Sequence, residues 1–241
     1  MAHNTRPRQI FRIFPAEVTR TDRQAVADWR QAPDELAPLP ATDPALDKAK
    51  RVFDFTVAAL SLALLLPLMA LLAVLIKLTS PGPLIYRCAV VGHLGRPFAL
   101  YKFRTMVPGA SRQKIQLLAL NEADWPMFKM RRDPRTTRFG RFLRRHSLDE
   151  LPQLWNVIKG DMSLVGPRPV LQSEWLHFTP RQRRKLAIMP GAICLWHLKG
   201  QPRNLDDWIA LDLAYHKNRS MLLDLKILAG GLLFVIRGLN H

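Results

Sequence analysis

Residues 55–76, FTVAALSLALLLPLMALLAVLI, decide how the rest of this chain must fold. The stretch runs for 22 residues without a charged side chain. A helix rises about 1.5 Å per residue, so a helix of this length would just cross the hydrocarbon core of a bilayer. The stretch therefore predicts a membrane-associated helix, around which a polar domain has to be arranged.

Two features bear on whether this segment crosses the membrane. Pro67 lies in its middle, where a proline removes a helix hydrogen bond and forces a kink. Basic residues stand on both sides, so the positive-inside rule gives no preferred direction. A kinked single span and a bent segment that enters and leaves by the same face both agree with the sequence. The flanking basic residues are Lys48, Lys50 and Arg51 before the segment and Lys77 and Arg87 after it.

The 241-residue chain is strongly basic, with a formal net charge of +17 and an isoelectric point near 10.9. Such a charge calls for a polyanionic partner: nucleic acid, an anionic membrane face or phosphorylated substrates. Cys88 and Cys194 lie far apart and form no CxxC pattern, which indicates neither a disulfide framework nor a zinc site. The histidines show no metal-ligand spacing. These observations fit a protein of a reducing compartment.

The remaining sequence predicts a mixed α and β domain. Residues 1–47 are polar and rich in proline, which is typical of a flexible tail. Strand patterns at 84–87 and 98–103 flank a glycine-containing turn and predict a hairpin. The helical pattern at 221–236 has an uncharged part that is too short to span a bilayer, so it suits an interfacial helix. Helical spacing is found at 111–120, 138–145, 206–215 and 221–236.

Two adjacent carboxylates, Asp149 and Glu150, follow the most cationic stretch of the chain. Arginines hold phosphate oxygens, and carboxylates bind a divalent metal or attack phosphorus, so the pattern suits phosphate chemistry. Glycines and prolines around Gly160-Asp161 and Gly166-Pro167-Arg168-Pro169 then predict a fixed loop that presents Arg168. Residues 129–145 hold eight basic residues against the single acid Asp133: Lys129, Arg131, Arg132, Arg135, Arg138, Arg141, Arg144 and Arg145.

Each part of this pattern also has a simpler interpretation. If a helix begins near Asp149, the acids can merely cap free N–H groups and complement the helix dipole. A cationic helix can lie on anionic headgroups, which explains the arginines but not the carboxylates. Nucleic-acid binding would explain the charge, but a long apolar segment is out of place in such a module. Nucleic acid is therefore not expected as a partner.

From residue 50 onward, about four-fifths of the chain, the sequence closely resembles the bacterial sugar transferases of the monotopic phosphoglycosyl transferase superfamily. The Asp-Glu pair and the Gly-Pro-Arg-Pro block together make the match highly specific. The matching motifs are KRVFD at 50–54, KLTSPGP at 77–83, YKFRTM at 101–106, DPR at 133–135, RFLR at 141–144, SLDELPQLWN at 147–156, GDMSLVGPRP at 160–169 and LDLKIL at 223–228.

The resemblance implies a membrane enzyme that moves a sugar-1-phosphate from a UDP-sugar onto polyprenyl (undecaprenyl) phosphate and releases UMP. This reaction initiates surface glycan or exopolysaccharide synthesis. The resemblance further implies that Asp149 is the nucleophile and becomes an aspartyl phosphosugar. Glu150, the second catalytic residue, is expected to bind the Mg²⁺ that neutralises the diphosphate. Such help is physically needed, because two anionic substrates and an anionic nucleophile repel one another.

The same resemblance supplies a set of expected substrate-binding residues. Asp161 belongs to this set. Asp161 and Asp54 are both expected to organise the site or to pair with basic residues. The expected phosphate contacts are first Arg168 and Lys102, and then Arg104, Arg135 and Arg144.

The expected architecture is a small α+β globular domain with amphipathic interfacial helices and a re-entrant, helix–break–helix membrane anchor. Residues 1–47 form the tail, 48–79 the anchor and 80–241 the catalytic domain, which lies on the cytoplasmic face of a bacterial inner membrane. Anionic membrane lipids are expected partners, and a homo-oligomer is left open. The rival interpretation is a catalytically silent membrane adaptor, against which the intact Asp149, Glu150 and Arg168 speak.

Two departures from the family pattern stand out. The family's membrane helix commonly breaks at Ser-Pro, whereas this chain has Leu66-Pro67 and so lacks the serine that can bond freed backbone. Family members often carry a Trp-Gln-Val-x-Gly-Arg type sequence after the Pro-Gly that matches Pro190-Gly191. Here residues 195–203 read LWHLKGQPR, which would alter selectivity if this loop reads the sugar or nucleotide.

Overall fold

A computed structural model describes residues 43–199, 202 and 204–238, in which one long helix precedes an alternation of short strands and helices. This mixture confirms the predicted α+β class. Of the tail predicted for residues 1–47, residues 1–42 lie outside the described part of the chain. The chain is helical from Pro44 onward, so the anchor helix begins before the predicted boundary at residue 48.

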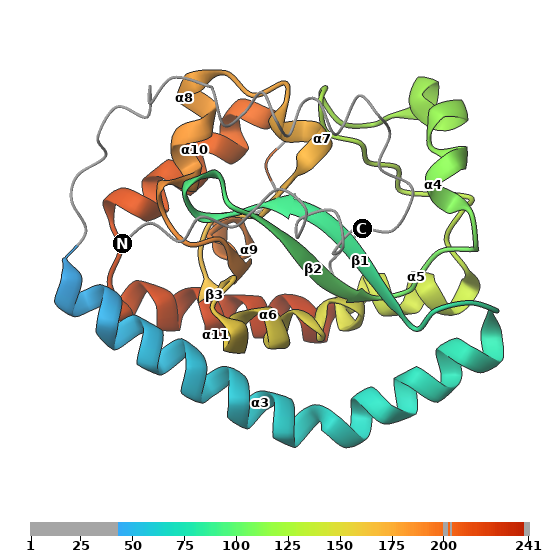
Figure 1. Ribbon diagram of the computed structural model, residues 1–241, viewed down its shortest axis with the longest axis horizontal. Helices are drawn as coiled ribbons and strands as arrows, with labels where there is room; N and C mark the ends of the chain where they lie inside the picture. Colours follow the sequence, from blue (N-terminus) through green and yellow to red (C-terminus); the bar gives the residue numbers. More distant parts are fainter. Residues whose placement is uncertain (1–42, 200–201, 203, 239–241) are drawn as a thin grey trace, which may run out of the picture.

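The apolar segment lies in α3, Pro44–Thr79. Asp43 caps this helix by accepting a hydrogen bond from the Ala45 N–H at 2.9 Å. The helix continues through Pro67 and bends into an arc along one side of the domain (Figure 1). The expected helix–break–helix form is therefore corrected in one respect. The proline bends the helix without interrupting it, because it removes one backbone hydrogen bond while the neighbouring ones remain.

Both arms of α3 pack on the same domain. In the first arm, Ala58 is fully buried in the main hydrophobic core. In the second arm, Leu72 and Ile76 pack against Phe103 and Leu143. By length and composition the helix could cross a membrane, and only 11% of its most apolar stretch is buried. Its exposed large apolar side chains are Val52, Phe55, Leu60, Leu64, Leu66, Leu68, Leu71, Val74 and Leu78.

Two small sheets form the centre of the domain. The predicted hairpin is confirmed as an antiparallel pair, β1 and β2, joined across a 3-10 turn, and β4 pairs with the other edge of β1. A separate parallel pair joins β3 to β5. The strands are β1 (Ile85–Val91), β2 (Pro97–Phe103), β3 (Ser163–Val165), β4 (Val170–Leu171) and β5 (Gly191–Ile193).

Helices surround these sheets, with α6 and α11 between the sheets and α3 (Figure 1). The helix predicted at 138–145 is α5, and the last two predicted helices are α10 and α11. The pattern at 111–120 is divided between one turn of α-helix, α4, and the 3-10 segment η3. The helices are α4 (Ala110–Gln113), α5 (Arg138–Arg145), α6 (Gln153–Lys159), α7 (Gln172–Trp175), α8 (Pro180–Arg183), α9 (Trp196–Lys199), α10 (Leu205–Lys217) and α11 (Met221–Arg237), with 3-10 segments η2 (His93–Gly95), η3 (Ile115–Leu120), η4 (Leu148–Glu150) and η5 (Arg184–Ala187).

A buried polar group, here called the anchor cluster, fastens α3 to α10 and α11. It consists of Lys50, Asp54, Tyr215 and Asp224. The Lys50 ammonium lies 2.6 Å from Asp224 Oδ2 and 3.4 Å from Asp54 Oδ1. The Tyr215 hydroxyl donates a hydrogen bond to Asp224 Oδ1 at 2.7 Å. Breaking a buried pair of this kind typically costs about 3–5 kcal/mol, so the cluster fixes the first arm of α3 on the domain.

Candidate active site

The two carboxylates of the Asp-Glu pair lie in the 3-10 turn η4, between α5 and α6. Ser147 precedes them in a left-handed conformation, with φ at 50°, which turns the chain sharply after α5. Because α6 begins only at Gln153, Asp149 is not the cap of that helix. The simpler interpretation, in which both acids only cap a helix, therefore does not hold for Asp149.

Asp149 is buried, with 6% of its surface exposed. Its Oδ1 atom is buried and has no hydrogen-bond partner among the described residues. Burial raises the pKa of Asp149, Lys102 lowers it, Glu150 raises it again and Arg144 lowers it, with a net value of about 6. Above this pH Asp149 is a desolvated carboxylate, one oxygen of which accepts no hydrogen bond from the described residues.

Glu150 forms an ion pair with Lys102, which projects from β2, at 2.5 Å between Oε1 and Nζ. Burial raises the pKa of Glu150, but the neighbouring ammonium lowers it more, so the net pKa lies below its usual range. Burial lowers the pKa of Lys102, but Glu150 and Asp149 raise it more, so this group stays cationic. Asp149, Glu150, Lys102 and Arg144 are here called the carboxylate cluster.

Arg144 completes the carboxylate cluster from the last turn of α5. Its Nε donates a hydrogen bond to Thr105 Oγ1 at 2.9 Å, which fixes the side chain near β2. Its positive charge lowers the pKa of Asp149, so it lies within electrostatic reach of the candidate nucleophile. The structure thus places Arg144 beside Asp149, while its predicted contact with a substrate phosphate stays a prediction.

Arg168 lies at the edge of the same cluster, on the loop after β3. Its charge lowers the pKa of Glu150, and its guanidinium lies 4.9 Å from the centre of the Trp208 ring. The backbone N–H of Arg168 donates to Asp212, which pairs with Lys185 at 2.5 Å in a buried ion pair. The loop that presents Arg168 is thus held by α10 through Asp212. The glycines and prolines of this loop had predicted a fixed conformation.

Two of the expected phosphate-binding arginines are occupied elsewhere. The Arg135 guanidinium is buried and paired through two nitrogens with Asp133, at 2.9 and 2.6 Å. The Arg104 guanidinium donates to the carbonyls of Ser80 and Pro83, at 2.6 and 2.5 Å, and so fastens the turn after α3 to β2. The structure gives both arginines partners within the protein, and their predicted contacts with substrate phosphates stay predictions.

Asp161 organises the end of α6. Its Oδ2 accepts hydrogen bonds from Asn156 Nδ2 at 3.2 Å and from Lys159 Nζ at 2.8 Å. Fully buried Asn156 in turn bonds the backbone of β2, at Ala99 and Tyr101. Asp161 therefore helps to hold α6, the helix after η4, against β2, the strand that carries Lys102. Asp54 belongs to the anchor cluster and has an organising role as well.

One side chain near the cluster was missed at the level of sequence. His197 in α9 stacks on Trp196, with ring centres 3.8 Å apart, and its Nδ1 lies 3.1 Å from both the backbone nitrogen and the carbonyl oxygen of Cys194. Burial lowers the pKa of His197, while the hydrogen bond to the Cys194 backbone and the negative charge of Glu150 raise it in part. A single histidine in an apolar run gives no local signal of this position. The only sequence signal was that His197 lies in the segment 195–203, which differs from the family pattern.

The residues present fit a magnesium ion held jointly with a substrate. No group of three or more His, Cys, Asp or Glu side chains could hold a metal alone in the part of the chain that the structure describes. Mg²⁺, however, is usually held by one or two carboxylates together with substrate phosphates. Glu150, directly beside Asp149, supplies one such carboxylate.

Comparisons with known proteins give a consistent result. Residues 46–238 match the family described as bacterial sugar transferase. The chain is 40% identical to galactosyl transferase CpsE of Streptococcus agalactiae, over 79% of this chain and 42% of that protein. It is 41% identical to the undecaprenyl-phosphate galactose phosphotransferase of Salmonella typhimurium, over 74% and 38%. It is 39% identical to the exopolysaccharide production protein ExoY of Sinorhizobium fredii, over 74% and 81%. The chain thus spans about two-fifths of the first two relatives and most of the third.

Proposed function

The chain belongs to the bacterial sugar transferase family, and on that premise we propose that it transfers a sugar-1-phosphate from a UDP-sugar to undecaprenyl phosphate and releases UMP. The product would initiate a surface glycan or exopolysaccharide. The names of relatives support the acceptor and the pathway class, since they include undecaprenyl-phosphate phosphotransferases for galactose and for glucose and an exopolysaccharide production protein. Galactose and glucose are therefore the first sugars to test.

The observation that carries this proposal is the buried carboxylate of Asp149, whose Oδ1 has no partner among the described residues although cations lie nearby. Buried polar atoms are nearly always bonded in native proteins, so an exception calls for an explanation. A nucleophile awaiting a substrate phosphorus supplies that explanation. A silent adaptor would have no reason to keep a desolvated carboxylate whose oxygen accepts no hydrogen bond.

The proposed reaction has two half-reactions. In the first, an Asp149 oxygen attacks the phosphorus that bears the sugar, the bond from that phosphorus to the bridging oxygen breaks, and UMP leaves. In the second, an oxygen of undecaprenyl phosphate attacks the same phosphorus, the acyl phosphate bond breaks, and Asp149 is regenerated as a carboxylate. Each half passes through a similarly charged phosphorus centre, so the same cations act in both.

The remaining residues of the site have roles that follow from their positions. Lys102 and Arg144 hold positive charge against the incoming diphosphate, and Arg168 contacts its outer oxygens. Glu150 would hold Mg²⁺ together with the substrate, and a bound Mg²⁺ would neutralise charge on the diphosphate. The pair with Lys102 orients Glu150 before substrate arrives.

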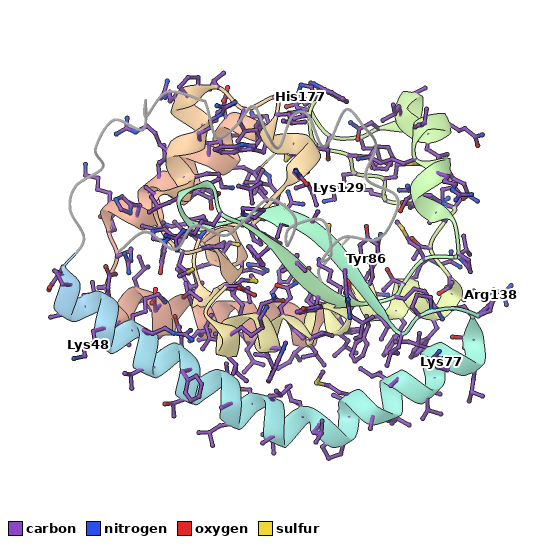
Figure 2. The ribbon with its side chains drawn as sticks, in the orientation of Figure 1. Lys48, Lys77, Tyr86, Lys129, Arg138 and His177 are labelled. Carbon is purple, nitrogen blue, oxygen red and sulfur yellow. The ribbon has the colours of Figure 1, made fainter. Side chains whose placement is uncertain are left out.

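The membrane setting is part of the same proposal. The exposed leucines of α3 and α11 would lie in the cytoplasmic leaflet of the bacterial inner membrane, with basic side chains on anionic lipids. Figure 2 shows Lys48 and Lys77 near opposite ends of α3, both exposed. One domain holds both arms of this helix, which favours the re-entrant form over a span.

Incubation of the purified protein with Mg²⁺, undecaprenyl phosphate and a panel of UDP-sugars tests the activity. We expect UMP release with at least one hexose donor, and no release from any donor would overturn the proposal. Radiolabelled UMP added without lipid tests the covalent step, because label should move into the UDP-sugar. Exchange that needs the lipid would favour direct transfer and remove Asp149 as nucleophile.

Cysteine labelling tests the membrane placement. Lys48→Cys and Lys77→Cys, made separately in a variant lacking Cys88 and Cys194, should react with a membrane-impermeant reagent only after the cytoplasmic side is opened. Labelling of either position from the periplasm in intact cells would indicate a span.

A further inference from the structure

A recess outside the carboxylate cluster opens between α4, η3, α7 and the loop at residues 121–129. It has a volume of about 220 Å³. No carboxylate lies among the residues that form its wall. Its wall includes Lys114, Trp125, Met127, Phe128, Ser173 and His177.

The loop that forms one wall of the recess is fixed by its own hydrogen bonds. The Asn121 side chain donates to the carbonyls of Ala123 and Met127, both at 2.8 Å, and accepts the Lys129 N–H at 2.8 Å. The Glu122 N–H closes the loop by donating to the Lys129 carbonyl at 2.8 Å. The aromatic wall is therefore formed before any ligand arrives, which lowers the entropic cost of binding.

One side chain of the recess wall contacts a residue of the candidate active site. Met127 is buried and forms part of the wall, and its sulfur lies 3.9 Å from Arg168 Nη1. The recess therefore lies beside Arg168, within reach of an extended ligand whose phosphates contact that guanidinium. The nucleotide donor of the proposed reaction has such an extended shape, with a planar base at one end.

Positive charge accumulates at the junction. Lys129 is half-buried, and no carboxylate lies within ion-pairing distance of its ammonium among the residues described. Burial, Arg131 and Arg168 lower the pKa of Lys129 and Glu122 raises it in part, so the net pKa lies below its usual value. An anion between Lys129 and Arg168 would relieve this repulsion, and the diphosphate of the donor carries the required charge.

The recess also lies on the side from which a soluble nucleotide would come. Figure 2 shows Lys129 and His177 on the side of the molecule away from α3, while Lys48 and Lys77 lie along α3. Trp125 is 64% exposed and packs edge-on against His177, with ring centres 5.0 Å apart. The Lys114 ammonium lies 5.4 Å from the centre of the Phe128 ring.

We propose that this recess binds the nucleoside of the UDP-sugar and that Lys129 contacts the diphosphate beside Arg168. The inference rests on the proposed function, which it deepens by assigning the donor's orientation. Trp125 and Phe128 offer aromatic surface for a base, while Lys114 and Ser173 offer donors for the uracil carbonyls. A sugar ring is less well suited, because its many hydroxyl donors would find no carboxylate acceptor in the wall.

Two variants with matched controls test the assignment. Trp125→Ala removes exposed aromatic surface and should leave the fold intact, and its control is Leu120→Ala, an exposed apolar residue outside the wall. Lys129→Gln removes the unpaired cation, and its control is Lys217→Gln at the exposed end of α10. UMP and hexose-1-phosphate binding is measured by calorimetry, and KM is measured for the donor and the lipid.

Both test variants should weaken UMP binding and raise the donor KM about tenfold, since base stacking and a charge-assisted contact each contribute on this scale. The KM for undecaprenyl phosphate and the affinity for hexose-1-phosphate should stay unchanged in Trp125→Ala. Weaker hexose-1-phosphate binding with unchanged UMP binding would place the sugar in the recess and overturn the inference. Unchanged UMP binding in both variants would overturn it as well. Failure of the proposed function is distinguishable, because the wild-type protein would then release no UMP.

Discussion

The molecule contains two clusters of buried charge that differ in how completely their atoms are bonded. In the anchor cluster, Asp224 accepts from both Lys50 and Tyr215, at 2.6 and 2.7 Å. In the carboxylate cluster, Glu150 is paired, but the Oδ1 atom of Asp149 is buried without a partner among the described residues. Both clusters join distant parts of the chain, so burial and charge alone do not separate structure from chemistry.

The bonding of the buried atoms distinguishes a structural cluster from a catalytic one. A cluster whose buried polar atoms are bonded to fixed partners stabilises an arrangement, and its loss lowers the stability of the fold. A cluster in which a buried carboxylate oxygen lacks a bonding partner carries a cost that a substrate or metal can relieve, and its loss lowers activity. The two clusters should therefore respond in opposite ways to the loss of a carboxylate.

The largest expected effect is on activity at Asp149. Asp149→Asn should lower UMP exchange and transfer by at least about 10⁴-fold, because an amide does not attack phosphorus. The measurement is exchange of labelled UMP into the UDP-sugar under saturating Mg²⁺. Asp207→Asn, an exposed change on α10, is the control and should keep wild-type exchange. Turnover of the Asp149 variant within tenfold of wild type would remove the distinction between the clusters.

The next effect concerns folding in the anchor cluster. Asp224→Ala removes the nearer carboxylate of Lys50 and leaves only Asp54, at 3.4 Å. It should lower the free energy of unfolding by about 3–5 kcal/mol. Chemical denaturation in detergent measures this loss. Asp43→Ala, which removes an exposed helix cap from the same helix α3, should cost only about 1 kcal/mol. A loss at Asp224 no larger than that of the cap variant would show that the cluster does not fix α3.

A smaller effect of opposite sign is expected for the stability of Asp149→Asn. The pKa of Asp149 rises to about 6 in the folded protein from an ordinary 3.8, so the folded state binds this proton more tightly than the unfolded state. Ionised Asp149 therefore costs stability above pH 6, by about 2–3 kcal/mol, and costs nothing below about pH 4. The variant should be more stable than wild type at pH 7.5, with the gain disappearing on acidification. Destabilisation at both pH values would contradict this.

The smallest effect is a displaced pH profile. Exchange at low donor concentration should fall about tenfold per pH unit below pH 6, because protonated Asp149 cannot attack. The positive charge of Lys102 lowers the pKa of Asp149, so Lys102→Gln should move this acidic limb upward by about one unit. Lys159→Gln, whose partner is Asp161, should leave the limb in place. Coincident limbs for the Lys102 variant and wild type would indicate that another group controls the profile.

Much of the fold was predictable because local chemistry determined it. The apolar segment, the hairpin of β1 and β2, and α5 all follow from short-range patterns in the sequence. The unbroken path of α3 through Pro67 was not predictable, because packing of both arms on the domain decides whether a kink becomes a break.

The candidate site was predictable in part for the same reason. The Asp-Glu pair and Arg168 stand in distinctive local motifs. Arg104 and Arg135 look equivalent to Arg144 in the sequence, but their partners come from tertiary contacts with Pro83 and Ala110, which composition does not reveal. The pair of Arg135 with Asp133 did have a local signal in their spacing of two residues. The unmatched oxygen of Asp149 depends on everything around it, and no sequence pattern encodes it.

The docking of both arms of α3 bears on how this protein reaches its membrane. A segment that crosses a bilayer obliges a polar loop to pass through hydrocarbon, where each unsatisfied backbone group costs several kcal/mol. Here the residues on both sides of the apolar stretch belong to one folded unit, so no polar loop has to pass. In the proposed setting the protein can therefore leave the ribosome, fold, and then enter one leaflet from the cytosol without a translocation channel. Its biogenesis would depend on shielding the exposed leucines of α3 until lipid replaces water around them.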